Sequence, residues 1–234
     1  MMSYIELENV VKRFKVFNNE IIANNNISFS LEKGEFVVIL GTSGAGKSTL
    51  LNILGGMEKP DSGNIFIDGK NIAKFNNKEL TDYRRFDVGF IFQFYNLLPN
   101  LTALENVELA TDIVNNTVDS YEILRELGLY ERANNFPSQL SGGEQQRVSI
   151  ARAIAKMPKI LLCDEPTGAL DYKTGIQVLK LLKKLSKDKN ITVIIVTHNS
   201  AISEIADKII HIHDAKIKKI DINTSPKNVE ELEW

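Results

Sequence analysis

Apolar and polar positions alternate along the first forty residues. Residues 3–40 read as short strands, because turn residues interrupt the alternation at "NNN" (24–26) and at Lys33-Gly34, just before "EFVVIL". "KSTLLNILGG" then has the spacing of a helix that ends at Gly55-Gly56, and "GNIFIDGK" alternates again up to a turn at Asp68-Gly69. This pattern predicts an antiparallel N-terminal sheet that leads into a core strand, with one helix bracketed by β structure.

The middle of the chain has a different period. From Asn76 to about Lys156 apolar residues recur mostly at helical spacing, with Pro99 and Pro137 as breaks. No strand in this stretch is as clear as those on either side. We therefore expect a helical subdomain, residues 94–156, inserted into an α/β core.

Strands and helices alternate again in the last third. The apolar strand "KILLCDE", a helix over about 173–187, the strand "ITVIIVTH" and a helix near 200–206 predict a parallel sheet that is covered on both faces. "KIIHIHDAKIKKI" predicts a closing hairpin with its turn at Asp214-Ala215. The tail, residues 221–234, has room for one short helix after Pro226, but we expect it to pack loosely.

The stretch "GTSGAGKST" lies between the core strand and the first helix, and it fits a phosphate-binding loop at every position. Its glycines let backbone N–H groups converge on phosphates at the positive end of a helix. Lys47 adds charge for the β- and γ-phosphates, and the Ser48 hydroxyl can bind Mg²⁺. The residues expected to hold the nucleotide here are Gly41, Ser43, Gly44, Ala45, Gly46, Lys47, Ser48 and Thr49.

Two acidic residues end the buried strand "ILLCDE". Ligands of parallel α/β sheets bind at the carboxyl ends of strands, so Asp164 is a candidate for the Mg²⁺ shell. Glu165 faces differently and is placed to activate an attacking water. Adjacent acids in isolation commonly mark a solvent-facing strand end, and the phosphate loop in the same chain is what favours the catalytic interpretation.

Gln93, His198 and Ser141 are ambiguous as single residues. Gln93 ends the apolar strand of "FIFQFYNLLP" and could bind Mg²⁺ or water, although a lone Gln there is more often surface. His198 ends a core strand, where an imidazole could bond the γ-phosphate or simply be structural. Ser141 precedes two glycines and a strong helical pattern, which indicates a second helix start that can bind an anion.

Composition excludes several classes of protein. The 28 Lys and Arg residues against 30 Asp and Glu give a formal net charge of −2, which argues against non-specific nucleic-acid binding. Arg84-Arg85 and Lys183-Lys184 read as solvated surface, and the single Cys163 is expected to be buried and reduced. No apolar run approaches the ~20 residues of a membrane span, and no signal-peptide pattern is present, so we expect a cytoplasmic location.

The ordered set of motifs is specific. "GTSGAGKS", Gln93, "LSGGEQQ", "ILLCDE", "GALD" at 168–171 and "VTH" ending at His198 resemble the nucleotide-binding subunit of ATP-binding cassette (ABC) transporters over about residues 4–220. "FIFQFYNLLPNLTALENV" and "DEPTGALD" look most like the lipoprotein-releasing and macrolide-export ATPases. The fold implied is α/β, a P-loop NTPase core with a mainly parallel sheet, an N-terminal antiparallel β subdomain and an inserted α-helical subdomain.

The resemblance implies a role for each motif residue. Glu165 would be the general base, His198 the switch histidine and Gln93 the γ-phosphate sensor, with Ser48, Gln93 and Asp164 around Mg²⁺. Phe14 would stack on adenine where the family more usually has Tyr, with Phe17 as the alternative. Ser141 and Gly143 would bind the γ-phosphate of a nucleotide held by a second subunit, with Gly142 in the same nucleotide-binding loop, and Asp171 would lie across the dimer interface.

The predicted activity is therefore ATP hydrolysis in a homodimer that forms on ATP binding and drives separate membrane permease subunits from the inner face of the membrane. One domain is expected, with a core of residues 1–93 and 157–220, the helical subdomain 94–156 and the tail 221–234. Two alternatives are a soluble ABC ATPase that acts on DNA or ribosomes and a small-molecule phosphotransferase. The first usually has a coiled-coil insertion or two cassettes, and the second would make "LSGGEQQ" and "VTH" coincidences. Glu144, where Gln is common, and Asn199, where Asp is common, depart from the family pattern without removing a catalytic atom.

Overall fold

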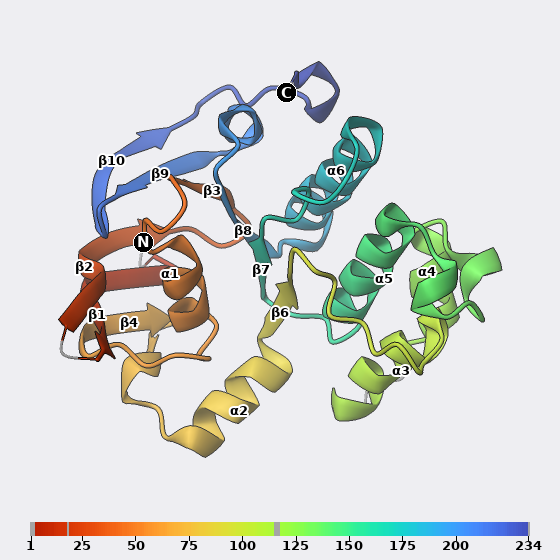
Figure 1. The fold of residues 1–234 in the computed structure, drawn as a ribbon, viewed down its shortest axis with the longest axis horizontal. Coiled ribbons are helices and arrows are strands. Elements are labelled where there is room, and N and C mark those ends of the chain that lie inside the picture. Colours follow the sequence, from red (N-terminus) through yellow and green to blue (C-terminus); the bar gives the residue numbers. More distant parts are fainter. Residues whose placement is uncertain (1–2, 18, 115–117, 234) are drawn as a thin grey trace.

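The computed structural model describes residues 3–17, 19–114 and 118–233, and it consists of a central sheet, an N-terminal sheet and a group of helices (Figure 1). The central sheet has the strand order β10-β9-β3-β8-β7-β6. In that order its strands are Lys216–Ile222, Lys208–His213, Phe36–Leu40, Thr192–Thr197, Ile160–Asp164 and Val88–Ile91. All neighbours are parallel except β9 and β10, so the predicted parallel sheet and closing hairpin are confirmed.

Both faces of the central sheet are buried. Val37 and Ile39 belong to one apolar cluster, which includes helix α1 (Lys47–Leu54), while Val38 belongs to another, which includes helices α5 (Gly142–Ile154) and α6 (Tyr172–Lys189). Successive side chains of a strand point to opposite faces, so a continuous apolar run suits a strand with helices on both sides.

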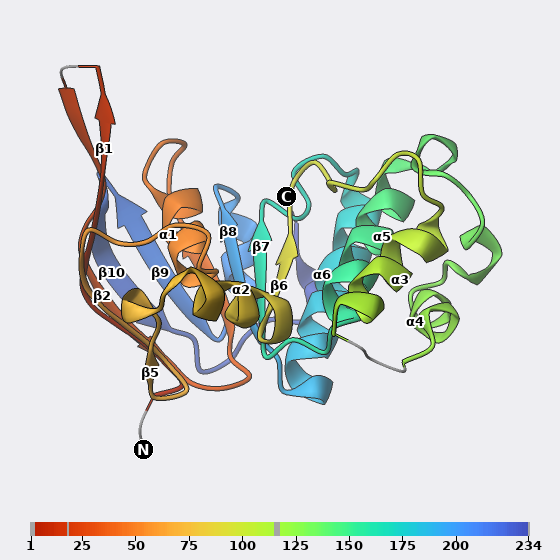
Figure 2. The same cartoon turned by 90° about the horizontal axis from the view of Figure 1, so that it is seen from below.

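The N-terminal sheet is antiparallel, as predicted, and lies against α1 on the side away from the helical group (Figure 2). Its strand order is β2-β1-β4-β5. The strands are β1 (Ile5–Val16), β2 (Asn19–Leu31), β4 (Ser62–Ile67) and β5 (Lys70–Asn71). A short 3₁₀ turn, Ile72–Lys74, and helix α2 (Asn77–Phe86) then lead into β6.

Helices α3 (Ala103–Val114), α4 (Ser120–Glu126) and α5 gather at the other end of the molecule (Figure 2). Buried Asn106 in α3 joins this group to the segment before it, because its amide donates to the carbonyls of Leu98, Leu101 and Thr102. Within the described residues, no helix has both the length and the apolar character that a bilayer span requires. The division of the chain into a core, a helical subdomain and a tail stays a prediction.

Two expectations about packing are wrong. The tail is docked, because Val229 and Leu232 are buried and the Tyr172 hydroxyl donates to the Leu232 carbonyl. Lys183 is buried instead of solvated, since its Nζ donates to the Ile205 carbonyl and to Asp207 Oδ1, both at 2.8 Å. Cys163 is buried and free, as expected.

Replacing Lys183 with Met is expected to lower the free energy of unfolding by about 1–3 kcal/mol, because the Ile205 carbonyl and the Asp207 carboxylate lose a buried donor. Chemical denaturation measures the loss. The matched control is Lys184→Met on the same helix, which removes an exposed ammonium and should change stability by less than about 0.5 kcal/mol. Equal stability of the two variants would contradict the structural role of Lys183.

Candidate active site

A cavity of about 1080 Å³ opens at the carboxyl ends of the central strands. The phosphate loop forms its floor, and Gln93, Asp164, Glu165 and His198 line one wall. Side chains of the β1–β2 hairpin line another wall. The structure thus brings together the motif residues that lie at the ends of β3, β6, β7 and β8.

The phosphate loop depends on a close approach at Gly46. This residue has φ +94°, and a Cβ there would lie 1.9 Å from the Ala23 carbonyl oxygen of β2. Buried Asn24, next along β2, donates to the Gly46 carbonyl at 3.1 Å. Only glycine fits this position, and the N-terminal sheet therefore supports the start of α1.

Lys47 is buried at the first position of α1. Its Nζ donates to the carbonyls of Gly41 and Thr42, at 2.8 and 2.9 Å. The ammonium is thereby held over the loop, at the end of the helix where N–H groups have no intrahelical partner. Loop and lysine together form a site for an anion.

Ser48 and Asp164 supply neighbouring oxygen atoms. The Ser48 hydroxyl donates to Asp164 Oδ1 at 3.3 Å. Burial raises the pKa of Asp164, the Glu165 charge raises it further, and Ser48 and Lys47 oppose the rise. Hydroxyl and carboxylate oxygens suit Mg²⁺, which takes few protein ligands and shares others with phosphates. Among the described residues there is no cluster of three or more His, Cys, Asp or Glu side chains that could hold a metal.

The Glu165 carboxylate is fixed by the end of β8. Its Oε2 accepts from the Thr197 hydroxyl at 2.8 Å, and its Oε1 accepts from the His198 backbone N–H at 2.9 Å. His198 Nδ1 lies 2.7 Å from the same Oε1. The contact joins the imidazole to the carboxylate, and most of the His198 side chain stays exposed. Glu165 also has φ +46°, a strained conformation that the surrounding contacts maintain.

Gln93 lies against the loop that follows β7. A Cβ on Gly168 would be 3.2 Å from Gln93 Nε2 and 3.5 Å from Glu165 Cβ. The sensor candidate and the acidic pair are therefore neighbours.

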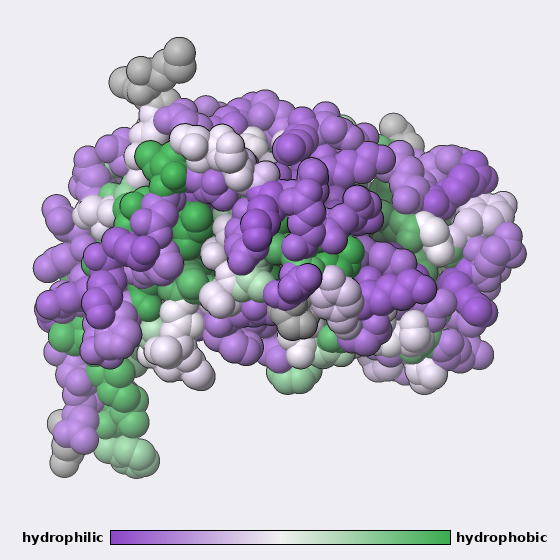
Figure 3. Space-filling view, turned by 90° about the horizontal axis from the view of Figure 1, so that it is seen from above, coloured by the Kyte–Doolittle hydropathy of each residue, from purple (hydrophilic) through white to green (hydrophobic). Residues whose placement is uncertain are grey.

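The hairpin of β1 and β2 carries apolar side chains along its projecting end (Figure 3). Phe14, Ile21 and Ile22 line the cavity, whereas Phe17 is fully exposed and is not part of its lining. Of the two aromatic candidates for stacking on a base, Phe14 lines the same cavity as the phosphate loop and Phe17 does not.

The second glycine loop lies elsewhere. Ser141 caps α5, with its Oγ accepting from Glu144 N–H, and a Cβ on Gly143 would lie 2.3 Å from Thr174 Cγ2 in α6. Asp171 caps α6 by accepting from the Thr174 backbone and hydroxyl. The starts of α5 and α6 therefore pack together, and Ser141, Gly142, Gly143 and Asp171 do not line the cavity of their own chain.

Sequence reasoning missed other residues of the cavity wall. His211, His213 and Lys218 of the closing hairpin line it. β9 runs parallel to β3 and pairs His211 with Leu40, directly before the phosphate loop. The sequence did contain a signal for this wall: His213 ends β9, and the carboxyl ends of parallel strands gather at the same edge of the sheet.

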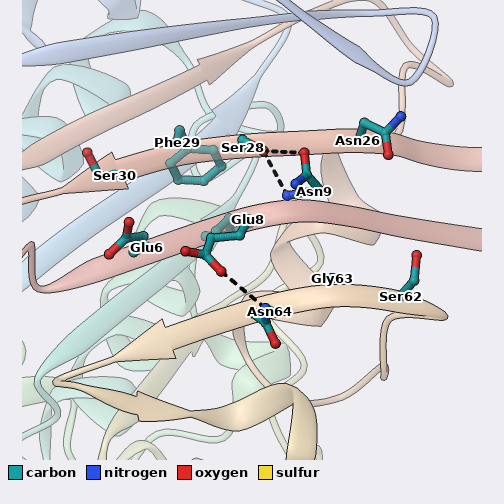
Figure 4. A pocket seen from close by; sticks show the side chains of 11 residues that line it. Glu6, Glu8, Asn9, Asn26, Ser28, Phe29, Ser30, Ser62, Gly63 and Asn64 are labelled. Carbon is teal, nitrogen blue, oxygen red and sulfur yellow. Dashed lines mark hydrogen bonds between the residues drawn. The ribbon is translucent and has the colours of Figure 1, made fainter.

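A second hollow of about 810 Å³ lies on the outer face of the N-terminal sheet (Figure 4). Some of its polar side chains pair within the hollow: Asn64 donates to Glu8, and the Ser28 hydroxyl accepts from Asn9 N–H. It contains none of the phosphate-loop residues. The larger cavity, which holds the phosphate loop and the acidic pair, is therefore the candidate active site.

The family model described as ABC transporter matches residues 24–168, which include the phosphate loop, the α5 start and the acidic pair. The chain belongs to the ABC transporter family. Its relatives are named ABC transporter ATP-binding proteins, and the resemblance to macrolide-export proteins is supported by one of them, the macrolide export ATP-binding/permease protein MacB of Bartonella quintana. That protein is 44% identical over 90% of this chain and 33% of its own length.

Other ABC relatives differ in length. The uncharacterized ABC transporter ATP-binding protein MJ0796 of Methanocaldococcus jannaschii is 45% identical over 92% of this chain and 95% of its own. The MG065 homolog of Mycoplasma pneumoniae is 43% identical over 98% of this chain, which spans only 50% of that protein. A dimeric structure of the MJ0796 cassette in a post-hydrolysis state bound to ADP and Pi matches with a TM-score of 0.86 and 42% identity, covering 93% of this chain and 98% of that one. The predicted α/β cassette fold is confirmed.

Asp164→Asn is expected to stabilise this ABC subunit without nucleotide at neutral pH, because it removes a desolvated carboxylate beside Glu165. Because the pKa of Asp164 is raised in the folded protein, the carboxylate destabilises the fold to its full extent at any pH above that folded-state pKa. The destabilisation is lost as the pH falls from that value towards the ordinary value of 3.8. Thermal unfolding at several pH values should therefore show a gap between variant and wild type that closes towards low pH. Asp82→Asn, at an exposed position, is the control, and a gap that widens in acid would contradict the prediction.

Proposed function

We propose that this chain hydrolyses ATP at two composite sites in a head-to-tail homodimer and thereby drives membrane permease subunits. The observation that carries the proposal is the separation of two anion-binding helix starts. One, at α1, lies in the cavity with the acidic pair, and the other, at α5, lies outside it with Ser141 exposed. A second subunit could complete the cavity with its α5 start.

Lys47 and the backbone of residues 43–49 would bind the ATP phosphates, and Phe14 would stack on adenine. Ser48, Asp164 and Gln93 would hold Mg²⁺, which supplies charge neutralisation at the β- and γ-phosphates when bound. The oxygen pair of Ser48 and Asp164 supports this assignment.

Glu165 would accept the proton of the attacking water as general base. Hydrogen bonds from Thr197 and His198 hold its carboxylate in one orientation, which a base that must meet a water requires. His198 would reach the γ-phosphate with Nε2, and Gln93 would report the presence of that phosphate to the neighbouring segment.

Symmetry gives the dimer its form. If Ser141 of one subunit meets the nucleotide on Lys47 of the other, the reciprocal contact follows, so two equal sites form. Ser141, Gly142 and Gly143 would close over the γ-phosphate, and Asp171 would lie at the same interface. Glu144 brings a negative charge to the start of α5, because its Oε2 accepts from both the N–H and the hydroxyl of Ser141, at 2.8 and 2.9 Å.

The permease would dock next to Gln93. Phe94 is 78% exposed and Leu98 is also exposed, which gives the segment after the sensor an apolar surface suited to a helix of a membrane partner. The chain would then work in the cytoplasm at the inner face of the membrane. Its net charge of −2 gives no support for nucleic acid as a partner.

Glu165→Gln is expected to retain ATP binding and to lower kcat by about 10²–10⁴-fold, because the amide keeps the shape of the side chain but cannot take a proton. Steady-state hydrolysis and nucleotide affinity are measured separately. Glu204→Gln, which replaces an exposed carboxylate with a carboxamide, serves as the control. Turnover near the wild-type rate in Glu165→Gln would remove Glu165 from the mechanism.

Mixing two inactive chains tests the composite sites. Lys47→Ala removes the phosphate-loop ammonium, and Ser141→Arg blocks the α5 start, so each homodimer has two damaged sites. A heterodimer that pairs them in trans gathers both lesions in one site and leaves the other intact. We expect differently tagged, co-purified chains to recover nucleotide occlusion at one site and part of the hydrolysis rate. A folded heterodimer that occludes no nucleotide would show that the α5 start does not act across a dimer.

A further inference from the structure

The segment that follows Gln93 is attached to the helical group by side chains from two helices. Arg152, in the last turn of α5, donates from Nη1 to the Asn96 carbonyl at 2.6 Å and from Nη2 to the Tyr95 carbonyl at 3.0 Å. Buried Asn106 of α3 accepts from the Leu98 N–H at 2.8 Å and donates to the Leu98 carbonyl at 3.1 Å. Backbone atoms from Tyr95 to Leu98 are thus bonded to the helices.

The backbone held by Arg152 is strained. Tyr95 and Asn96 have φ values of +55° and +50°, so two successive residues with a Cβ lie in the left-handed region. Such a conformation persists only where surrounding contacts fix it. The planar guanidinium supplies that restraint, since its forked N–H groups match two adjacent carbonyl oxygens.

The guanidinium is itself partly withdrawn from water, and this burial lowers the pKa of Arg152. Hydrogen bonds from a charged donor such as this guanidinium are stronger than those between neutral groups. Two residues after the end of α5, Lys156 Nζ donates to the Val88 carbonyl at 2.6 Å. Strand β6 and the segment after it are consequently bonded, on the two sides of Gln93, to Lys156 just beyond α5 and to Arg152 within it.

The other end of α5 meets the same segment. A Cβ on Gly142 would lie 2.9 Å from the Tyr95 hydroxyl oxygen, so the ring of Tyr95 reaches the first residue of the helix. Tyr95 therefore contacts α5 at its start through the ring and near its end through the backbone carbonyl. No similar side-chain bond attaches Gln93 itself to α5 within the described residues.

We propose that Arg152 is a positioning residue, which fixes the Tyr95 and Asn96 carbonyls so that Gln93 and the start of α5 move as one unit. Removing the fork frees the strained backbone two residues after the sensor, and Gln93 loses its defined approach to the γ-phosphate. The inference rests on the proposed role of Gln93 in ATP hydrolysis. Arg152 touches neither nucleotide nor metal in this assignment.

A double-mutant cycle tests the proposal. Arg152→Met should lower kcat about tenfold and change the KM for ATP less than twofold, since the phosphate loop is untouched. Arg152→Lys should lie between Met and wild type, because one ammonium cannot reproduce the fork. In a Gln93→Ala background, Arg152→Met should lower kcat by less than a further twofold. Arg125→Met, which removes an exposed arginine of α4, is the control and should match wild type.

A merely structural role for Arg152 would give a loss that multiplies with that of Gln93→Ala, and this result would overturn the proposal, as would a wild-type kcat in Arg152→Met. If Arg152→Met does not fold, Arg152→Lys is carried through the same cycle.

Hydrogen exchange on the nucleotide-free protein separates this inference from the proposed function. Arg152→Met should speed exchange of the Tyr95 and Asn96 amides and leave the Leu98 amide, which Asn106 holds, unchanged. Unchanged exchange at Tyr95 and Asn96 would overturn the inference whatever the ATPase results. An inactive wild type with the expected exchange pattern would instead count against the proposed function alone.

Discussion

Parallel pairing of β3, β8 and β7 is the constraint on which the site depends. The register pairs Leu40 with Thr197 and Asp164 with Val196, so the chain leaves all three strands at one edge. Because both faces of these strands are apolar, alternation of polar and apolar residues does not select the register. The sizes of the packed side chains and the polar residues at the strand ends must do so. A shift by one position would separate Glu165 from the Thr197 and His198 groups that hold it.

The N-terminal sheet adds a second constraint to the same edge. β2 supports Gly46 from below, while the end of its hairpin carries Phe14, Ile21 and Ile22 into the cavity. One piece of β structure therefore positions both the phosphate loop and the apolar wall. This explains why a sheet outside the parallel core belongs to the site: the distance between the anion-binding end and the apolar end of the cavity is set by rigid strands and not by a loop.

Residues that follow buried strands could be predicted, because local pattern marks where a strand ends and a parallel sheet collects those ends. Lys47, Asp164, Glu165 and His198 are of this kind. Lys183 and Arg152 could not, because their partners lie 22 and 56 positions away along the chain and no local pattern specifies them. A lysine in "KK" looks like surface until the Ile205 carbonyl and Asp207 are brought against it. The docked tail was missed for the same reason, since Leu232 bonds to Tyr172 at the start of α6, 60 positions away along the chain.

Helix α5 connects the second glycine loop, at Ser141, to the segment that follows Gln93, which Arg152 contacts. It has 13 residues, and at ~1.5 Å per residue it spans about 20 Å, from the Ser141 cap to the last turn that carries Arg152. In the proposed mechanism this short helix would move as one body and transmit a displacement at Ser141 to the backbone that follows Gln93. The contact is made to carbonyl oxygens, which every residue type provides. The attachment therefore does not depend on the side chains of Phe94 and Leu98, and these two exposed residues can be replaced without altering how the segment is held.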